Sequence, residues 1–481
     1  MHKRATGSRW KTDVVTTRRA PRSSSVPSTL AAFDEPIETP EQRIAAGKAM
    51  RANTARTSHH EWAPPSDRVD PVDRLVESNR SRLADLVPLR YSRMAASPFA
   101  FLRGSALVMA HDLASTPVSG LQVRLCGDAH IANFGVFASP ERRLVFDLND
   151  FDEAAPGPFE WDVKRLAASI EVAARENGLS PSQARGVVVR AIATYCEWMA
   201  SYAEMTHLDV WYAKLDITDL MNLLQPSNAV RRRTEASMRK AAGKNHLKAL
   251  DKLTESIDGR HRFIDDPPIV QRLDGDDMQQ RLEHLLHGYR NSLTADRQAL
   301  FDRYRFIDFA RKVVGVGSVG TRCWMVLLQG PNAGPLFLQV KEACAAAPNE
   351  ALGVTAKQHE GQRVVEGQRM LQAASDVLLG WGTDPTTGTH YFVRQLWDAK
   401  GSIDVATMRP EGFAHYAQLC GRALARAHAR TGDSVTISGY LGTSSRFPEA
   451  VADFASAYAD QTVTDHARLL AALADGTITA D

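Results

Sequence analysis

The residue types best suited to chemistry gather in one short run of the chain, Leu125-Cys-Gly-Asp-Ala-His-Ile-Ala-Asn133. The run follows an apolar stretch with the pattern of a β-strand, and Asp128 stands five positions before Asn133. A loop at a strand end can direct the carboxylate of Asp128 at a substrate hydroxyl while the amide oxygen of Asn133 binds Mg²⁺. His130 lies between them, and we expect it to order the loop rather than to do chemistry.

A second acidic run follows a second strand-like stretch, where Leu144–Leu148 leads into Asn149-Asp-Phe-Asp-Glu153. Phosphoryl transfer requires such a set, because an aspartate must orient the acceptor and hard oxygen ligands must hold a metal beside the phosphates. Asp150 and Asp147 are both candidates for the second metal ligand, and Asp152 is expected to support the turn. The alternatives for this segment are an acidic hairpin turn without chemistry and a phosphatase site, since Asp-x-Asp weakly resembles the haloacid-dehalogenase motif.

A glycine pattern occurs far downstream, as Gly315-Val-Gly317-Ser318-Val-Gly320. In a dinucleotide-binding fold a helix must begin at such a loop, whereas in a kinase the loop joins two antiparallel strands and covers the ATP phosphates. The next residues alternate as in a strand, which favours the second context. We therefore expect Gly315, Gly317, Ser318 and Gly320 to bind the nucleotide.

A lysine ends the next apolar strand, Pro335-Leu-Phe-Leu-Gln-Val-Lys341. A buried lysine needs an ionic partner, because an isolated charge is costly to remove from water. A helix expected over about 349–374 offers Glu366, which we favour, and Glu360. The strand Tyr391-Phe-Val-Arg-Gln-Leu-Trp397 then fits a hinge whose backbone, at Gln395, Leu396 and Trp397, would bind adenine.

These segments resemble known kinases. Gly127-Asp-Ala-His-Ile-Ala-Asn133 resembles the catalytic loop of aminoglycoside and choline kinase-type enzymes, and Asp150-Phe-Asp152 resembles their metal turn. The resemblance implies that Asp128 is the catalytic aspartate and that Asn133 binds the metal. It favours Asp150 as the second ligand, although Asp147 lies nearer the usual spacing. It also implies that Asp162, at the start of a helix, holds the catalytic loop, although a plain helix cap explains that residue equally well.

The order of these motifs is reversed relative to ordinary kinases, because Asp128 precedes Gly315. The helix ending in Leu419-Cys-Gly-Arg-Ala-Leu-Ala-Arg-Ala-His428 resembles the one that precedes the catalytic loop in such enzymes. A circular permutation explains both observations. The chain, over about residues 70–470, also resembles the bacterial domain-of-unknown-function family numbered 2252, through Cys-Gly-Asp-Ala-His-Ile-Ala-Asn-Phe-Gly, Phe-Asp-Leu-Asn-Asp-Phe-Asp-Glu, Trp-Asp-Val-Lys-Arg-Leu and Arg-Val-Val-Glu-Gly-Gln-Arg.

The predicted architecture is α+β, a circularly permuted, protein-kinase-like, two-lobed fold with extra helices. Residues 1–65 are expected to form a basic, poorly ordered arm and residues 66–300 a helical lobe with the catalytic loop and metal-binding hairpin. Residues 301–400 form a β-rich nucleotide-binding lobe, and 401–481 contribute helices that complete the helical lobe. Long helices are predicted over 72–94, 98–113, 161–174, 182–202, 231–262, 349–374, 413–430 and 448–473.

Composition sets the remaining expectations. The chain has 481 residues, a formal net charge of +2 and five scattered cysteines without a CxxC pair. We therefore expect a cytoplasmic protein without a disulfide framework, a zinc site, a membrane span or a specific nucleic-acid partner. The expected function is an ATP- and Mg²⁺-dependent phosphotransferase acting on an unknown hydroxyl acceptor, a small molecule rather than a protein. Alternatives are a nucleotide-binding regulatory pseudokinase and nucleotidyl transfer from the same site.

Overall fold

The computed structural model describes residues 37–218, 246–273, 276–355, 358–396, 401–402 and 404–481. Part of the predicted N-terminal arm, residues 1–36, lies outside this description. The rest of the arm is ordered, which corrects the prediction, because α1 (Pro40–Met50) and the 3₁₀ helix η2 (Arg56–His60) form there. Arg51 anchors this segment by donating from Nε to the carbonyl oxygen of Tyr440 at 2.8 Å.

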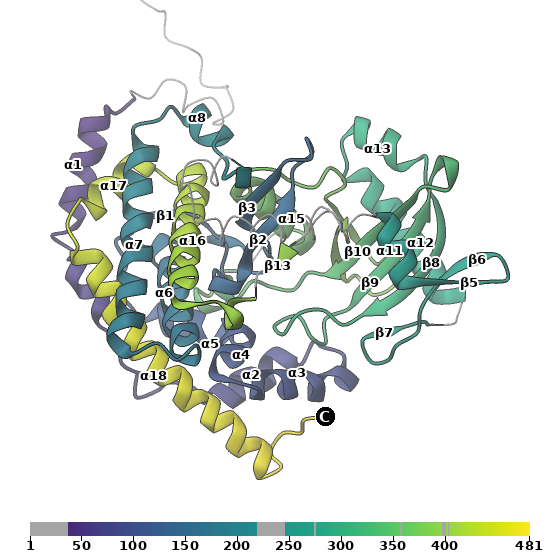
Figure 1. Ribbon diagram of the computed structural model, residues 1–481, viewed down its shortest axis with the longest axis horizontal. Helices are drawn as coiled ribbons and strands as arrows, with labels where there is room; N and C mark the ends of the chain where they lie inside the picture. The colour runs from purple at the N-terminus through teal and green to yellow at the C-terminus, as the bar shows by residue number, and fades with distance from the viewer. Residues whose placement is uncertain (1–36, 219–245, 274–275, 356–357, 397–400, 403) are drawn as a thin grey trace, which may run out of the picture. The chain divides into compact units, whose positions relative to one another are not determined.

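The fold is mixed α+β (Figure 1). Helices precede, interrupt and follow the strands. Among the described residues, the helices before the large sheet are α2 (Pro71–Asn79), η3 (Ala84–Leu86), α3 (Val87–Ala95), α4 (Pro98–Gly104), α5 (Ala106–Ala114), η4 (Ile131–Asn133), α6 (Phe159–Glu176), α7 (Pro181–Ala203), α8 (His207–Tyr212) and α11 (His246–Leu253). Those within and after it are α12 (Asp276–Asn291), α13 (Ala295–Phe301), η5 (Pro331–Ala333), α14 (Ala347–Ala351), α15 (Glu360–Leu371), η6 (Val405–Thr407), α16 (Pro410–Thr431), α17 (Ser434–Leu441) and α18 (Arg446–Ala474).

Within the described residues, six antiparallel strands form the largest sheet, in the order β11-β12-β10-β9-β8-β7. Smaller sheets pair β1 with β4, β13 with β2 and β3, and β5 with β6. The strands are β1 (Gln122–Leu125), β2 (Phe134–Ala138), β3 (Leu144–Leu148), β4 (Ala155–Pro158), β5 (Thr254–Ile257), β6 (Arg260–Phe263), β7 (Val270–Gln271), β8 (Arg305–Lys312), β9 (Cys323–Gln329), β10 (Pro335–Glu342), β11 (Gly380–Thr383), β12 (His390–Gln395) and β13 (Gly401–Ser402).

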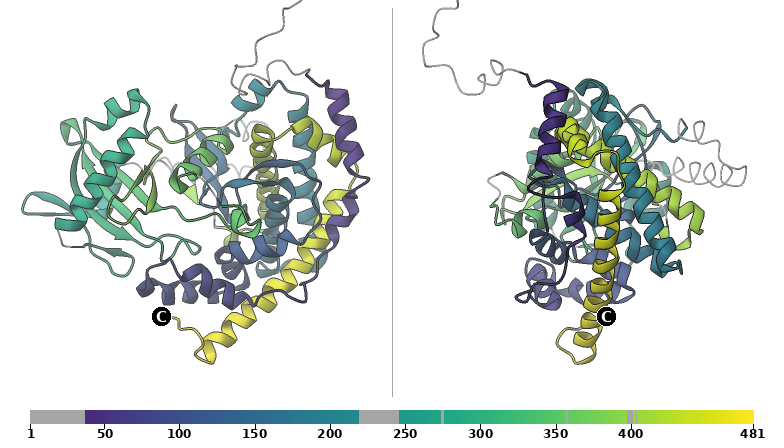
Figure 2. Two further views of the ribbon diagram at one scale, coloured as in Figure 1. Left: turned by 180° about the vertical axis from the view of Figure 1, so that it is seen from behind. Right: turned by 90° about the vertical axis from the view of Figure 1, so that its left-hand side faces the viewer.

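The largest core joins helices that lie far apart in the sequence. Figure 1 shows α6 and α7 beside α16, and the views of Figure 2 show α18 running along the same group of helices. Apolar residues at helical spacing supply the contact: Val188, Ile192 and Tyr195 of α7 are buried with Ala417 and Leu424 of α16. The helical part is thus assembled from both sides of the large sheet's sequence.

The large sheet has its own core. On one face, Leu282, Leu285 and Tyr289 of α12 pack against Trp324 and Val326 of β9. A cluster on the opposite face includes Met325, Leu327 and Phe337 with Ala249 of α11. This two-sided packing follows from the alternation of side chains along a strand.

Several predicted helices are interrupted, and glycine or polar residues mark the breaks. The helix expected over 349–374 is wrong at its start: α14 ends at Ala351, and Gly353 follows with φ +64°, the conformation with which many helices end. The helix expected over 98–113 divides at Ser105, where φ is −116° and ψ is 39°. The helix expected over 72–94 divides between α2 and α3.

The helix expected over 231–262 is only partly within the description. Residues 231–245 lie outside it, α11 covers part of the remainder, and 254–263 form the β5–β6 hairpin instead. Asp258 and Gly259 take positive φ values of 51° and 75° at the hairpin turn, which a helix would not allow. No helix among the described residues has the length and apolar character needed to cross a bilayer.

Candidate functional site

The Asp128 loop leaves β1 through a glycine that no other residue could replace without strain. Gly127 has φ +80°, and a Cβ built on it would lie 2.0 Å from the carbonyl oxygen of Glu153. The close approach brings the backbone after Asp150 against the backbone before Asp128. The glycine therefore sets the distance between the two acidic segments that the sequence singled out.

Asp162 holds the start of this loop in place by accepting hydrogen bonds from its main-chain N–H groups. Its Oδ2 accepts a hydrogen bond from the main-chain N–H of Cys126 at 2.6 Å, and its Oδ1 accepts one from Gly127 at 2.9 Å. His428 of α16 lies 3.2 Å from the same Oδ2. Asp162 stands in the first turn of α6 and is 1% exposed, so these contacts are shielded from water. They are the hold on the loop that the sequence predicted.

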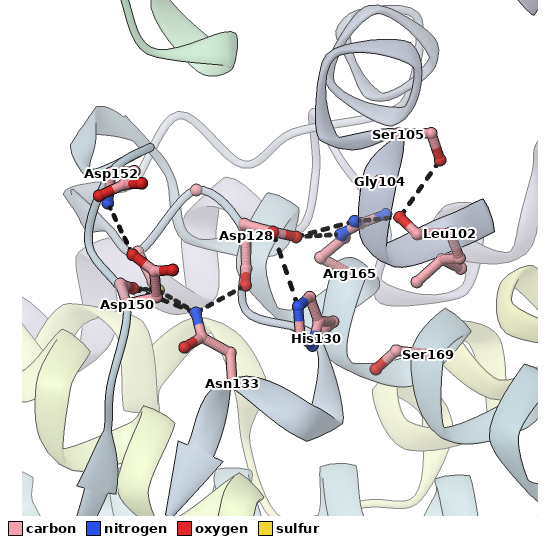
Figure 3. Close-up of polar contacts among 12 residues, drawn as sticks. Leu102, Gly104, Ser105, Asp128, His130, Asn133, Asp150, Asp152, Arg165 and Ser169 are labelled. Atoms are coloured by element: carbon pink, nitrogen blue, oxygen red, sulfur yellow. Dashed lines mark hydrogen bonds and ion pairs between the residues drawn. The ribbon is translucent and has the colours of Figure 1, made fainter. Parts of the chain in front are cut away.

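Asn133 ties the two acidic segments together (Figure 3). Its Nδ2 donates to the main-chain carbonyl oxygens of Asp128, at 3.0 Å, and Asp150, at 3.1 Å. The side chain is buried at the end of η4, directly before β2. Because the amide nitrogen is committed to these carbonyls, the orientation of the amide oxygen is fixed as well.

The carboxylate of Asp128 points toward a buried arginine (Figure 3). Oδ1 accepts from Nε of Arg165 at 2.9 Å and from Nη2 at 2.8 Å. Nη2 of Arg165 also donates to the carbonyl oxygen of Leu102 at 2.6 Å, which locks the guanidinium in place. Nε2 of His130 lies 3.7 Å from Oδ2. The arginine thus engages one carboxylate oxygen and leaves Oδ2 for another partner.

His130 is neutral at ordinary pH. Burial, together with the positive charges of Arg103 and Arg165, outweighs the attraction of Asp128 and lowers its pKa to about 4. The main-chain N–H of His130 donates to the carbonyl oxygen of Asp128 at 2.8 Å, and its own carbonyl accepts from the N–H of Asn133 at 2.7 Å. These are main-chain contacts that do not depend on the imidazole, so the expected role of the His130 side chain in ordering the loop stays a prediction.

Lys341 reaches the acidic turn from the large sheet. The side chain is 2% exposed, forms an ion pair with Asp152, and its Nζ lies 3.9 Å from Oδ2 of Asp150. Although burial opposes it, the charges of Lys341 and Arg394 lower the pKa of Asp150 to about 2. Burial and the neighbouring Asp150 raise the pKa of Asp152. Asp150, whose side chain is 45% exposed against 25% for Asp152, is the more accessible carboxylate of the two.

The predicted partners of Lys341 are wrong in this structure. Oε1 of Glu366 accepts from Gln362 at 2.7 Å, and Oε2 of Glu360 accepts from Nε of Arg363 at 2.5 Å. α15 begins at Glu360 and buries Arg363, whose guanidinium pairs with Glu360, so that glutamate is already engaged within its own helix. The turn that carries Asp152, rather than the helix, supplies the carboxylate that pairs with Lys341.

Asp147 does not belong to the candidate site formed by Asp128, Asn133, Asp150 and Lys341. Its carboxylate is fully buried, and Nη2 of Arg426 donates to both oxygens at 2.8 Å. Oδ2 also accepts from the main-chain N–H of Ala373 at 2.8 Å. With these donors around it, Asp147 has a structural role, and the alternative that made it a metal ligand is wrong for this arrangement.

The glycine loop joins β8 to the antiparallel β9, so no helix begins there and the dinucleotide-binding alternative is wrong. Gly315 and Gly320 have φ values of +65° and +89°. The loop is held through its carbonyls: Arg93 donates to Gly315 at 2.5 Å, and Arg82 donates to Val319 at 2.6 Å. The carbonyl of Ser318 accepts from the hydroxyl of Thr321, and a Cβ on Gly317 would lie 3.2 Å from the carbonyl oxygen of Arg103.

The hinge residues are only partly described. The main-chain N–H of Gln395 donates to Oδ2 of Asp376 at 2.5 Å, and that of Leu396 donates to the carbonyl oxygen of Phe337 at 3.0 Å. Both N–H groups are thus used within the protein and are not offered to adenine, while the prediction that this backbone binds adenine stays open for its carbonyl groups. Trp397 lies outside the described residues.

The oxygen atoms of Asp150 and Asn133 suit Mg²⁺ better than a metal ion that requires three or more protein ligands. The described residues contain no group of three or more His, Cys, Asp or Glu side chains able to hold a metal. Mg²⁺ commonly takes one or two protein oxygens and completes its shell with water and phosphate. The ionised carboxylate of Asp150 and the oriented amide of Asn133 would supply that number.

Two functional candidates, Arg165 and Arg394, were missed from the sequence. Arg165 follows Asp162 by three positions on one helix, so both side chains face the same loop; that spacing was a usable signal. Nη1 of Arg394 donates to the carbonyl oxygen of Asn149 at 3.3 Å. Its alternation with Phe392 along β12 shows only that it faces one side of the sheet, and nothing in the pattern names its partner.

Comparison with known proteins gives one match. The family model described as an uncharacterized protein conserved in bacteria, DUF2252, matches residues 82–472 and so covers the Asp128 loop, the acidic turn, the glycine loop and Lys341. No curated protein and no solved structure is significantly similar to the chain. The matched segment extends over most of the sequence, and the chain therefore belongs to the bacterial family DUF2252.

Proposed function

We propose that the protein is an ATP- and Mg²⁺-dependent phosphotransferase with a protein-kinase-like, circularly permuted fold. The observation that carries the proposal is the meeting of Lys341, from the sheet, with Asp150 and Asp152, from the hairpin after the Asp128 loop. A strand lysine, a metal-turn carboxylate, a loop asparagine and a loop aspartate form the set that phosphoryl transfer requires. Because segments far apart in the sequence bring these groups together, a coincidence of unrelated motifs is a poor explanation.

Each group has a role that its contacts support. Oδ2 of Asp128 would accept the hydrogen bond of the acceptor hydroxyl, because Oδ1 is held by Arg165. Lys341 would bind nucleotide phosphate oxygens in exchange for its contact with Asp152. Asp150 and Asn133 would hold Mg²⁺, which when bound would neutralise phosphate charge. Arg165 has no contact with the transferred group in this scheme and positions Asp128.

The chain order also supports a permuted fold. The end of α16 lies beside β1, since Oγ1 of Thr431 accepts from the N–H of Arg124 at 3.2 Å. A Cβ on Gly432 would lie 2.7 Å from a methyl of Val123, so the two segments are in direct contact. β1 leads straight into the Asp128 loop. The late helix and the early loop are therefore spatial neighbours, as consecutive elements would be in an unpermuted kinase.

Nucleotide binding is tested by thermal unfolding of the protein with and without Mg²⁺–ATP. A native-state ligand at a hundredfold excess over its Kd stabilises the protein by about 2.7 kcal/mol, which raises Tm measurably. We expect the rise to require Mg²⁺ and to disappear in Lys341→Met. Lys312→Met, a lysine substitution on β8, is the matched control and should keep it. Equal shifts in both variants would sink the proposed site.

Turnover needs a separate test. Asp128→Asn should bind Mg²⁺–ATP as the natural protein does but lose transfer to any acceptor found in a panel of hydroxyl compounds. Labels on the α- and γ-phosphates distinguish phosphoryl from nucleotidyl transfer, because only the moved phosphorus appears in the product. Full turnover in Asp128→Asn would contradict its role.

Nucleotide binding without turnover is the second candidate, and one observation favours it. No glutamate of α15 pairs with Lys341, which instead lies against the carboxylates of the metal turn. In protein kinases the ion pair between this lysine and a helix glutamate must be in place for activity, so a lysine paired elsewhere favours a regulatory protein. Binding of ATP together with unchanged α- and γ-labels across the panel would select the regulatory protein.

A further inference from the structure

A cavity of about 220 Å³ lies between α12 and the large sheet. Its wall is mainly apolar, with guanidinium groups and one carboxylate among the lining residues. We call it the α12 cavity. Its lining includes Leu282 of α12, Trp324 and Tyr391 of the sheet, and Arg281, Arg311 and Arg322.

The α12 cavity is separate from the proposed active site. In the sheet register Trp324 pairs with Val340 and Tyr391 pairs with Glu342, which are the two neighbours of Lys341 on β10. Adjacent residues of a strand point to opposite faces. The cavity therefore lies on the face opposite Lys341, and a ligand in it would bind whether or not the proposed function holds.

The size of the cavity suits one ring or a short acyl chain. An apolar cavity of about 150 Å³ is large enough to take up benzene. The α12 cavity is moderately larger, and Trp324 and Tyr391 add aromatic surface beside the leucine side chains of α12. Aromatic rings pack favourably edge-to-face or offset against such walls.

The three guanidinium groups differ in how firmly they are held. Arg281 pairs with Asp384, which is only 5% exposed, and Arg322 pairs at 3.0 Å with Glu342, which is 8% exposed. Arg311 pairs at 2.8 Å with Asp85, whose side chain is 56% exposed. An ion pair to a carboxylate in water contributes little, so Arg311 is the cation most easily transferred to another anion.

A second property of Arg311 points the same way. Its side chain is 13% exposed, and its Nε is buried without a hydrogen-bond partner among the described residues. It also contacts Oε1 of Gln271 through Nη2 at 2.5 Å. A carboxylate at the cavity mouth would accept from this guanidinium in two-point geometry, which a neutral group cannot match.

We propose that the α12 cavity binds a small aromatic or short-chain carboxylate, with its apolar part against Trp324 and Leu282 and its carboxylate on Arg311 in exchange for Asp85. The charge of the ligand is set by Arg311 and its size by the cavity. Binding occurs on the face of the sheet opposite Lys341 and does not involve Asp128 or Asp150.

Ligand-observed ¹⁹F NMR tests the proposal with three probes of one shape: 4-fluorobenzoate, 4-fluorobenzyl alcohol and 4-fluorobenzylamine. We expect the benzoate to bind at least tenfold more tightly than the amine, with the alcohol between them. Leu282→Trp fills the cavity and should abolish binding of all three. Equal binding of the three probes, or no binding of the benzoate at millimolar concentration, overturns the proposal.

Two further variants, at Arg311 and Asp85, keep the test decisive if Leu282→Trp does not fold. Arg311→Met should lower benzoate affinity about tenfold and leave the alcohol unchanged. Asp85→Asn frees Arg311 from its competitor and should tighten benzoate binding several-fold, again without effect on the alcohol. A benzoate affinity that ignores both substitutions would show that the probe binds elsewhere, and the assignment of the cavity would fail.

Discussion

The Asp128 loop and the glycine loop are both close to the proposed nucleotide site, but they are held in different ways. The first is fixed by a buried carboxylate, Asp162, that accepts two main-chain N–H groups. The second is held by the partly exposed side chains of Arg82 and Arg93, which donate to its carbonyls. Buried, fully satisfied contacts rigidify a site, whereas exposed ones open at low cost. The Asp128 loop is thus preorganised, whereas the glycine loop is held by a latch, the contacts from Arg82 and Arg93, that can open at low cost.

The largest expected effect separates two glycines with the same backbone conformation. Gly127→Ala should destabilise the protein by about 4 kcal/mol, because a left-handed residue is strained and its Cβ would overlap the main chain of Glu153. Gly315→Ala, with φ +65° and open space around its Cβ position, should cost about 1 kcal/mol. Urea unfolding measures both, and similar costs would mean that the two loops are equally constrained.

The next comparison is between two separate carboxylates, Asp162 and Asp433. Asp162→Ala should cost about 3 kcal/mol, since two buried N–H groups and His428 lose their acceptor. Asp433 also accepts from two main-chain N–H groups, at 3.1 Å each, but caps α17 at a half-exposed position. Asp433→Ala should therefore cost only about 1 kcal/mol. A loss at Asp162 no larger than at Asp433 would remove the argument for a preorganised loop.

The acidic segment should also show in the pH dependence of stability. Burial raises the pKa of Glu153 from 4.5 to about 7. Between these values the folded protein holds a proton that the unfolded chain has released, so the free energy of unfolding falls as pH rises through this window. Because Glu153 is partly exposed, we expect a loss of about 2 kcal/mol.

Unfolding of the natural protein and Glu153→Gln from pH 4 to 8 measures this loss. The amide keeps an acceptor for the N–H of Ala347 but does not titrate, so the falling limb should flatten. Glu77→Gln, on the exposed side of α2, serves as the control and should leave the profile unchanged. A Glu153→Gln profile that still falls between pH 4.5 and 7 would exclude this carboxyl as the cause.

The smallest effect concerns the latch. Arg93→Ala removes one exposed hydrogen bond to Gly315 and should cost no more than about 1 kcal/mol. Amide hydrogen exchange of residues 313–322 should nevertheless become faster, because local opening no longer breaks that contact. Arg80→Ala, at an exposed position after α2, is the control and should leave the exchange unchanged. Unchanged exchange in Arg93→Ala would show that the latch lies elsewhere.

The sequence was most informative where a side chain forms hydrogen bonds with the backbone of a nearby loop. Asp128 and Asn133 were chosen from one short motif and Asp162 from the start of the following helix. The structure brings all three to the same loop, while their roles in catalysis and metal binding stay predictions. The β8–β9 hairpin around Gly315 and Gly320 was predicted for the same reason, since alternation and glycine spacing are local properties.

Pairings across the fold were less predictable. Lys341 needed a carboxylate, and the sequence offered Glu366 and Glu360 as well as the acidic turn that supplies it. Choosing among them requires the position of α15 against the sheet, which no local pattern encodes. The same applies to Asp147, whose buried partner Arg426 lies 279 positions away. Long-range ion pairs depend on packing, and one sequence does not specify which distant cation arrives.

The helical core combines α6 and α7 with α16, α17 and α18. This arrangement affects how the chain folds during its synthesis. More than two hundred residues separate the end of α7 from the start of α16. At a translation rate of 5–20 residues per second, the apolar faces of α6 and α7 wait roughly 10 to 40 s for their partners to leave the ribosome. During that interval the large sheet, whose partners are close in sequence, has time to form first. The order of folding in the cell is therefore expected to run opposite to the order in which the acidic loop and the sheet are encoded.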